Sequence, residues 1–101
     1  MKSAAQTAAL VVTIVLTAAC SEDSAPDATT LVSEKGCVAC HGIDGKATAP
    51  IYPNLNGQWE KYLRQQLFKY RSGERNNAIM NGFAASLTDE EIRALAQHYG
   101  I

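Results

Sequence analysis

The stretch Cys37-Val38-Ala39-Cys40-His41 decides how the rest of the chain is interpreted, because it contains the spacing C-x-x-C-H. Thiols at this spacing lie about one helical turn apart, so both can form thioethers with a single porphyrin. The next residue, His41, then lies under the iron, where an imidazole serves as the proximal ligand. The stretch therefore predicts one covalently attached c-type haem.

Two other uses of a CxxC pair have to be compared with haem attachment. A structural zinc site needs four ligands, and outside the motif the chain offers only Cys20 and His98. A redox-active dithiol usually lies near a βαβ pattern, and no segment here has a convincing strand pattern. Haem attachment is the favoured interpretation.

Residues 1–19 have the features of a secretory signal peptide. A positive start at Lys2 precedes an apolar stretch over 8–19 that is short for a membrane span and ends in small residues. The rest of the chain is therefore expected to be exported. Haem attachment of this type is expected outside the bacterial inner membrane, so the two signals agree.

Cys20 is expected to be the acylated first residue of a mature lipoprotein. Thr17 departs from the leucine more often found three places before such a cysteine, but the chain has three cysteines and the haem uses two. The alternatives are ordinary cleavage, which leaves a soluble periplasmic protein with a spare thiol, and an N-terminal anchor that is not processed. Residues 20–28 would then be the lipidated cysteine and a flexible acidic tether, and Ser21 resembles the pattern for outer-membrane sorting.

Residues 29–101 are expected to form one all-α domain with about three main helices. The first, over 30–40, has Thr29 or Thr30 as its N-cap, and the second, over 58–72, stops at Gly73. The third helix opens with a capping box whose two members are Thr88 and Glu91.

The connecting segments 42–57 and 74–87 are predicted to be long loops that cover the two sides of the porphyrin. A domain of this size has a small apolar core, and small exported domains usually need a covalent staple or a cofactor. A haem would supply the missing core.

Met80 is the expected second axial ligand of the iron. The chain has two methionines, and Met1 is lost with the signal peptide, so Met80 is the only thioether of the mature protein. A thioether favours the ferrous state and raises the haem potential. The alternatives are a packing role for Met80 and ligation by His98, whose place in the last helical turn also suits a surface cation.

These motifs together resemble class I cytochrome c, in the family's order. Its parts are CVACHG at 37–42, PNLNGQ at 53–58, the single Met80 and LTDEEI at 87–92. The chain is similar to the short bacterial forms, including the single-haem units of dihaem periplasmic cytochromes. The resemblance implies an all-α fold in which the N- and C-terminal helices cross and the haem lies in a crevice with one exposed edge.

The resemblance also implies roles for individual residues. Cys37 and Cys40 would bind the porphyrin, and His41 and Met80 would be its axial ligands. The carbonyl of Pro53 would accept a hydrogen bond from the proximal imidazole, which fixes its tautomer. The remaining candidate haem contacts, for which ordinary packing or a surface charge is the alternative, are Leu55, Trp59, Tyr62 and Arg75.

Because protein ligands fill both axial positions, the expected function is electron transfer and not enzyme catalysis. The expected partners are redox proteins at the periplasmic membrane surface: a membrane complex, a dehydrogenase, an oxidase or a reductase. One alternative is an electron-transfer subunit that works only inside a larger dehydrogenase. Another is a sensor or enzyme in which Met80 is not bound to iron. The formal net charge of −1 excludes a basic nucleic-acid binder.

Overall fold

The structure is a computed structural model that describes residues 7–15 and 26–101. The predicted acylation site Cys20 and most of the predicted tether lie outside these residues. Residues 7–15 have no regular secondary structure, and none of the described helices has the length and apolar character needed to cross a membrane.

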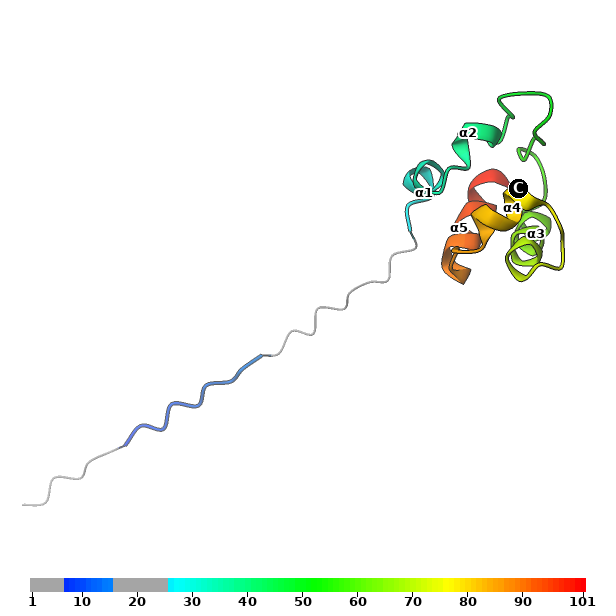
Figure 1. Cartoon of the computed structure of the whole chain (residues 1–101). Coiled ribbons are helices and arrows are strands. Elements are labelled where there is room, and N and C mark those ends of the chain that lie inside the picture. The colour runs from blue at the N-terminus through cyan, green and yellow to red at the C-terminus, as the bar shows by residue number, and fades with distance from the viewer. Residues whose placement is uncertain (1–6, 16–25) are drawn as a thin grey trace, which may run out of the picture.

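Five helices make up the described fold, and no strand occurs among the described residues (Figure 1). In chain order they are α1 (Ala28–Glu34), α2 (Val38–His41), α3 (Glu60–Ser72), α4 (Ala78–Ala84) and α5 (Asp89–Tyr99). The helix α5 packs against both α1 and α3, and α4 packs against α3. The expected pairing of the N-terminal and C-terminal helices is therefore present.

The first expected helix was wrong in two respects. Its N-cap is Asp27, whose carboxylate accepts hydrogen bonds from Thr30 N at 3.1 Å and Thr30 Oγ1 at 2.6 Å. A carboxylate directly before the first helical residue satisfies an amide of the first turn that a threonine at position 29 or 30 would leave unpaired. The helix also ends at Glu34, and the CVACH stretch forms the separate helix α2 beyond Gly36.

The second and third expected helices are confirmed, and the loop expected over 74–87 is partly wrong. Helix α3 ends at Gly73, which has a left-handed φ of 83° as a C-cap. Segment 42–57 contains no helix, but segment 74–87 contains α4. The side chain of Asn77 caps α4 by accepting hydrogen bonds from Ile79 N and Met80 N. That short helix lacks an apolar stripe long enough to detect by periodicity.

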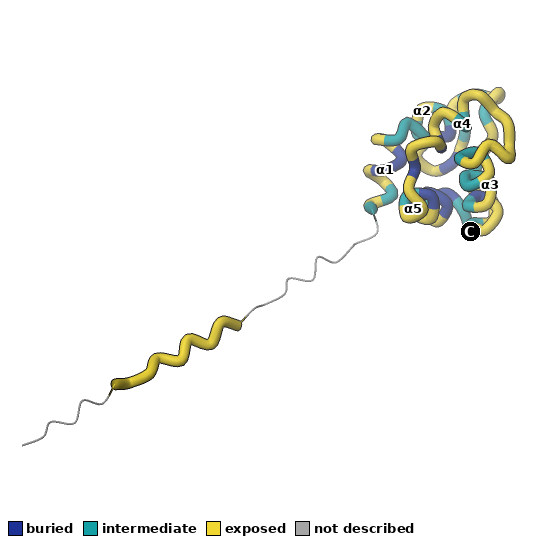
Figure 2. The backbone as a smooth tube through the Cα atoms, turned by 60° about the horizontal axis from the view of Figure 1, so that its bottom comes forward, coloured by how far each residue is buried: buried dark blue, intermediate teal, exposed yellow. Residues whose placement is uncertain are grey.

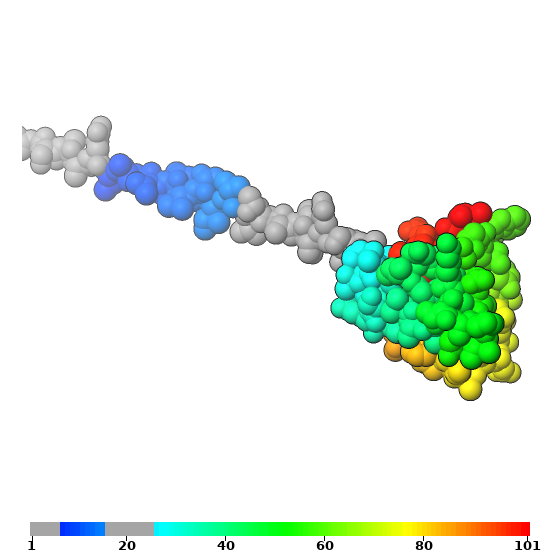
Figure 3. All heavy atoms as spheres, turned by 90° about the horizontal axis from the view of Figure 1, so that it is seen from above, coloured from blue at the N-terminus to red at the C-terminus, as the bar shows by residue number. Residues whose placement is uncertain are grey.

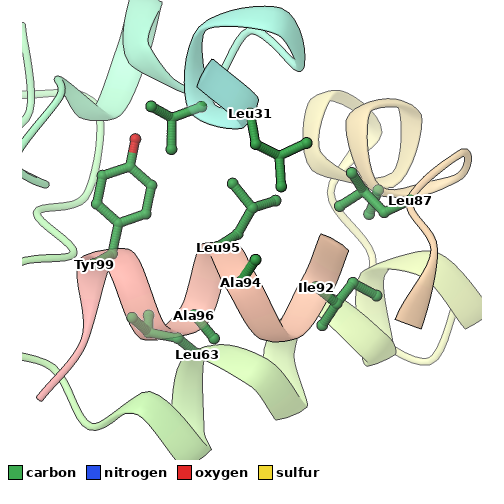
Figure 4. Packing of buried hydrophobic residues seen from close by; sticks show 10 residues of the cluster. Leu31, Leu63, Leu87, Ile92, Ala94, Leu95, Ala96 and Tyr99 are labelled. Carbon is green, nitrogen blue, oxygen red and sulfur yellow. The ribbon is translucent and has the colours of Figure 1, made fainter. Parts of the chain in front are cut away.

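The core gathers around α5, as Figure 2 shows in dark blue. Ile92 and Val32 are completely buried, and Leu95 is 2% exposed. Figure 4 shows Leu31 of α1 and Leu63 of α3 on opposite sides of α5. The other buried apolar residues are Ala84, Leu87, Ala94, Ala96 and Tyr99. The buried side chains of α5 thus hold both of its neighbours, α1 and α3.

The predicted capping box at the start of α5 is present, and a lysine side chain forms an ion pair with its glutamate. Thr88 N donates to Glu91 Oε1 at 2.9 Å, and Glu91 N donates to Thr88 Oγ1 at 3.1 Å. Lys35, the C-cap of α1, lies 3.2 Å from the second oxygen of Glu91. The backbone hydrogen bond from Thr88, followed by Lys35, lowers the pKa of Glu91 below its usual 4.5.

The lowered pKa of Glu91 predicts an acid-sensitive contribution to stability. Because the folded state favours the carboxylate, this contribution is present above the unfolded pKa and is lost as the pH falls through the lower folded pKa. We expect Glu91→Gln, which keeps the capping acceptor but removes the charge, to lower the free energy of unfolding by about 0.5–1 kcal/mol near neutral pH.

Urea unfolding of the haem-loaded protein between about pH 3 and about pH 7 checks this expectation. The difference between wild type and Glu91→Gln should shrink toward the acid end. A constant difference across the range would show that the charge of Glu91 does not matter.

Candidate functional site

Two hollows lie side by side between α2, α3, α4 and the loop after α2. Each has a volume of about 260 Å³. Among the described residues that line the hollows, only Arg75 carries a permanent charge. The walls are therefore largely uncharged. The residues that line both hollows are Cys37, His41, Pro53, Tyr70 and Met80. The shared walls make the two hollows parts of one crevice.

Segment 42–57 forms one wall of this crevice. Figure 3 shows the segment in green, covering one face of the domain with α1 in cyan beside it. Backbone hydrogen bonds hold the loop in place: Leu55 N donates to Gly45 O at 2.7 Å, and Asn56 N to the same oxygen at 3.1 Å. A long loop fixed in this way can present a backbone carbonyl at a defined position.

His41 is buried at the end of α2, with 8% of its surface exposed. Its Nδ1 lies 2.9 Å from the carbonyl oxygen of Pro53, which is the hydrogen bond that the family resemblance implied. A carbonyl only accepts, so Nδ1 must carry the proton and Nε2 must keep its lone pair. The imidazole is thereby prepared to bind a metal through Nε2.

Cys37 and Cys40 are both free thiols on the crevice wall. Cys37 is the N-cap of α2 and lines both hollows, whereas Cys40 lies in the last turn of α2 and lines the second. Burial raises the pKa of the Cys37 thiol. In the described part of the chain, no three Cys, His, Asp or Glu side chains converge as a structural zinc site would require.

Met80 lies in the first turn of α4, half-buried and on the wall of both hollows. Two asparagines fix this turn. Asn77 caps it, and the Asn81 amide donates to Tyr70 O and to Arg75 O, both at 2.8 Å. The thioether is therefore held by a helix that is tied to the end of α3.

The residues on these walls fit a haem. Two thiols one helical turn apart, an imidazole with a free Nε2 and one thioether share a mostly apolar crevice. Nitrogen and thioether sulfur are the donors that an electron-transfer haem takes as axial ligands. Uncharged walls also suit a flat apolar macrocycle.

Three of the other predicted contacts lie at the crevice, and one does not. Leu55, Tyr62 and Arg75 line the first hollow. The Arg75 guanidinium donates to Gln66 Oε1 at 2.8 Å and stacks 4.9 Å from the centre of the Tyr70 ring.

Trp59, the remaining predicted contact, lies away from both hollows. This residue is the N-cap of α3, is 70% exposed and lines neither hollow. Trp59 thus directly precedes Glu60, the first helical residue of α3.

Sequence reasoning missed the part that aromatic residues play in the walls. Tyr52 and Phe83 line the second hollow, and Tyr70 lines both. Tyr99 was not among the predicted site residues, yet it lines the first hollow and donates its hydroxyl to Gly42 O at 2.8 Å. Burial raises the pKa of Tyr99 to about 12, so its hydroxyl remains a donor at neutral pH.

His98 was expected to be a surface cation, but its side chain also makes specific contacts within the fold. Its Nε2 lies 2.6 Å from the carbonyl oxygen of Ile43, and its ring packs edge-on against Tyr99 at 4.9 Å. His98 is therefore occupied by a backbone contact, and it lines neither hollow.

The chain matches known proteins over most of this domain. The family model described as cytochrome c matches residues 26–98. Cytochrome c-554(548) of Halomonas halodenitrificans is 50% identical over 66 residues, which are 62% of this chain and 80% of that protein. Cytochrome c4 of Pseudomonas aeruginosa is 38% identical over 63 residues, which are 62% of this chain but 31% of that protein.

Solved structures agree with the sequence matches. Cytochrome c4 of Acidithiobacillus ferrooxidans superposes with a TM-score of 0.64 at 29% identity, covering 75% of this chain and 48% of that one. Reduced cytochrome c4 from Pseudomonas stutzeri also gives 0.64, at 31% identity, covering 73% and 45%. The chain thus spans less than half of these longer relatives.

These findings confirm three predictions made from the sequence. The first is the all-α class I fold, the second is haem c as the cofactor, and the third is the functional class, an electron carrier and not an enzyme. The crevice, its donor set and the match over residues 26–98 lead to one conclusion. The chain belongs to the cytochrome c family.

Proposed function

We propose that this chain carries one haem c, bound covalently through Cys37 and Cys40 and ligated axially by His41 and Met80, and that it transfers electrons at the periplasmic side of a bacterial membrane. The observation that carries the proposal is the protonated Nδ1 of His41 against Pro53 O at 2.9 Å, because it leaves Nε2 free on a wall shared with Met80.

When bound, the haem supplies a ferric–ferrous couple. The chain's residues determine how that couple behaves. Cys37 and Cys40 hold the porphyrin edge, the Pro53 carbonyl keeps the imidazole in one tautomer and raises its basicity, and the Met80 thioether favours the ferrous state. Two protein ligands leave no open position for a substrate, which favours electron transfer over sensing or catalysis.

Partners would dock where the second hollow reaches the surface. We name this surface the collar; its residues are Ile51, Tyr52, Ile79 and Phe83, which all line the second hollow. Ile51 is 82% exposed and Ile79 is 61% exposed, and none of the four carries a charge. An uncharged apolar rim suits brief contacts with fast release.

The collar predicts that a charge at Ile51 slows electron exchange. With Ile51→Lys, two copies that meet at this surface would each bring a new positive charge to an apolar contact. We expect the electron self-exchange rate constant to fall roughly fivefold at low salt. Magnetisation-transfer NMR on a mixture of ferric and ferrous protein measures that constant.

Ile101→Lys is the matched control, because Ile101 is 77% exposed and lines neither hollow. Its self-exchange rate should stay near the wild-type value. If both variants slow exchange equally, the effect belongs to net charge, and the collar is not the docking surface.

The partner is proposed to be a periplasmic dehydrogenase. Two similar proteins have names that refer to a dehydrogenase. They are the thiosulfate dehydrogenase electron acceptor of Thiomonas intermedia, 45% identical over 64 residues, and the cytochrome subunit of sulfide dehydrogenase of Chlorobaculum tepidum, 33% identical over 64 residues. The match covers 30% of the first protein and 57% of the second. Purification from native membranes would separate a free carrier from a subunit of a larger complex.

We propose that residues 1–19 are a lipoprotein-type signal peptide, that Cys20 is acylated, and that residues 20–28 tether the domain. The described helix α1 begins at Ala28 with Asp27 as its cap, so the folded domain starts slightly before residue 29. Intact-mass spectrometry of the purified protein tests this proposal together with the cofactor. The expected mass is that of a chain starting at Cys20 with one haem and acyl groups added. A measured chain that starts at another residue and carries no lipid would overturn the proposed lipid anchor but not the proposed haem.

A further inference from the structure

The end of α5 is bonded to the backbone that directly follows His41. The Tyr99 hydroxyl donates to Gly42 O at 2.8 Å, and His98 Nε2 lies 2.6 Å from Ile43 O. Since a carbonyl only accepts, His98 must donate through a protonated Nε2. Two consecutive residues of α5 thus hold two consecutive carbonyls, although they lie 57 and 55 positions away in the sequence.

The segment held in this way has little stability of its own. Helix α2 has four residues, which is far below the length at which a helix persists without tertiary contacts. The chain leaves α2 through Gly42, whose φ of 72° lies in the left-handed region. The direction of the chain after His41 must therefore be fixed by contacts from elsewhere.

The contacts around α2 divide into two groups. Thr48 holds the helix itself, because its hydroxyl donates to Ala39 O at 2.9 Å and its amide to Cys40 O at 3.0 Å. Tyr99 and His98 hold the residues beyond the helix. Tyr99 also meets the imidazole directly, with ring centres 6.5 Å apart and planes at 64°, which is an edge-to-face contact.

We propose that Tyr99 and His98 are positioning residues for the His41 imidazole. Pro53 O restrains the ring at Nδ1, and the last turn of α5 restrains the backbone that carries it and, through Tyr99, one ring edge. Figure 4 shows the Tyr99 ring standing out from α5 with its hydroxyl directed away from that helix. The inference rests on the proposed axial role of His41. It adds the contacts of Tyr99 and His98 that set the orientation of the imidazole ring.

A purely structural role makes a different prediction, because Tyr99 is also a core residue that is 6% exposed. The variant Tyr99→Phe separates the two roles, since it keeps the ring and its packing and removes only the hydroxyl. A structural role would change the free energy of unfolding alone. A positioning role would also change the electronic environment of the iron.

The experiment is proton NMR of the ferric, haem-loaded protein, whose haem methyl resonances respond to the orientation of the axial imidazole. We expect Tyr99→Phe and His98→Ala each to shift these resonances. His98→Gln, which restores an N–H donor, should return them toward the wild-type pattern. Ser72→Ala is the control: it removes a hydroxyl that bonds a carbonyl at the end of α3, 3.2 Å from Lys69 O, outside both hollows.

Unchanged methyl shifts in both Tyr99→Phe and His98→Ala would overturn the inference, even if both variants lose stability. A wild-type ferric spectrum without the signature of low-spin imidazole ligation would overturn the proposed axial role of His41, and the inference with it. The two failures are therefore distinguishable in one set of spectra.

Discussion

Replacing Met80 with alanine is expected to convert the ferric haem from a six-coordinate low-spin state to a high-spin state with an open or water-filled sixth position. Met1, the other methionine of the chain, falls in the proposed signal peptide, and His98 is bonded to Ile43 O and lines neither hollow, so we expect neither residue to replace Met80. The reduction potential should fall by roughly 0.1–0.3 V, a fraction of the about 0.8 V range that axial ligands cover.

Optical spectroscopy and a redox titration check both expectations. The weak long-wavelength band that reports sulfur ligation to ferric iron should disappear in Met80→Ala. The control is Asn76→Ala, an exposed position shortly before α4 that lines neither hollow. If Met80→Ala keeps that band and the wild-type potential, Met80 is a packing residue and the ligand assignment is wrong.

Replacing both Cys37 and Cys40 with alanine is expected to abolish covalent haem attachment. The chain without haem would have to keep open two hollows of about 260 Å³ each in a domain with a small core, which costs stability. We expect the yield of haem-containing protein to fall by more than about tenfold, because non-covalent haem is lost from a destabilised fold.

Intact-mass spectrometry under denaturing conditions measures the covalent link. Each single variant should retain one thioether and therefore the haem mass, which keeps the test informative if the double variant does not fold. Cys20→Ala should retain haem fully and lose only the expected lipid. A double variant that keeps haem after denaturation would contradict the account.

Much of the fold was accessible from local sequence signals. The capping box of Thr88 and Glu91 and the stop at Gly73 each depend on residues within a few positions of one another. The break after Glu34 and the helix that contains Met80 were not predicted. The latter is fixed by Asn81, whose partners Tyr70 and Arg75 lie 11 and 6 positions away, so its signal is tertiary.

The candidate site divides in the same way. The thiols, the imidazole and the thioether were found from residue type and spacing, because haem chemistry restricts which side chains can serve. Trp59 was proposed from the family resemblance, which does not reveal that in this chain the residue is the exposed N-cap of α3. The role of Tyr99 could not be predicted, because its partner Gly42 lies 57 positions away in the sequence and meets the end of α5 only in the folded chain.

The central claim is that His41 and Met80 complete the coordination of a single covalent haem. Near-infrared magnetic circular dichroism of the wild-type ferric protein tests it most directly, because the position of the charge-transfer band distinguishes the axial ligand pair. The account predicts the low-spin band of imidazole–thioether ligation. A band typical of two imidazoles, or a high-spin spectrum at neutral pH, would contradict it.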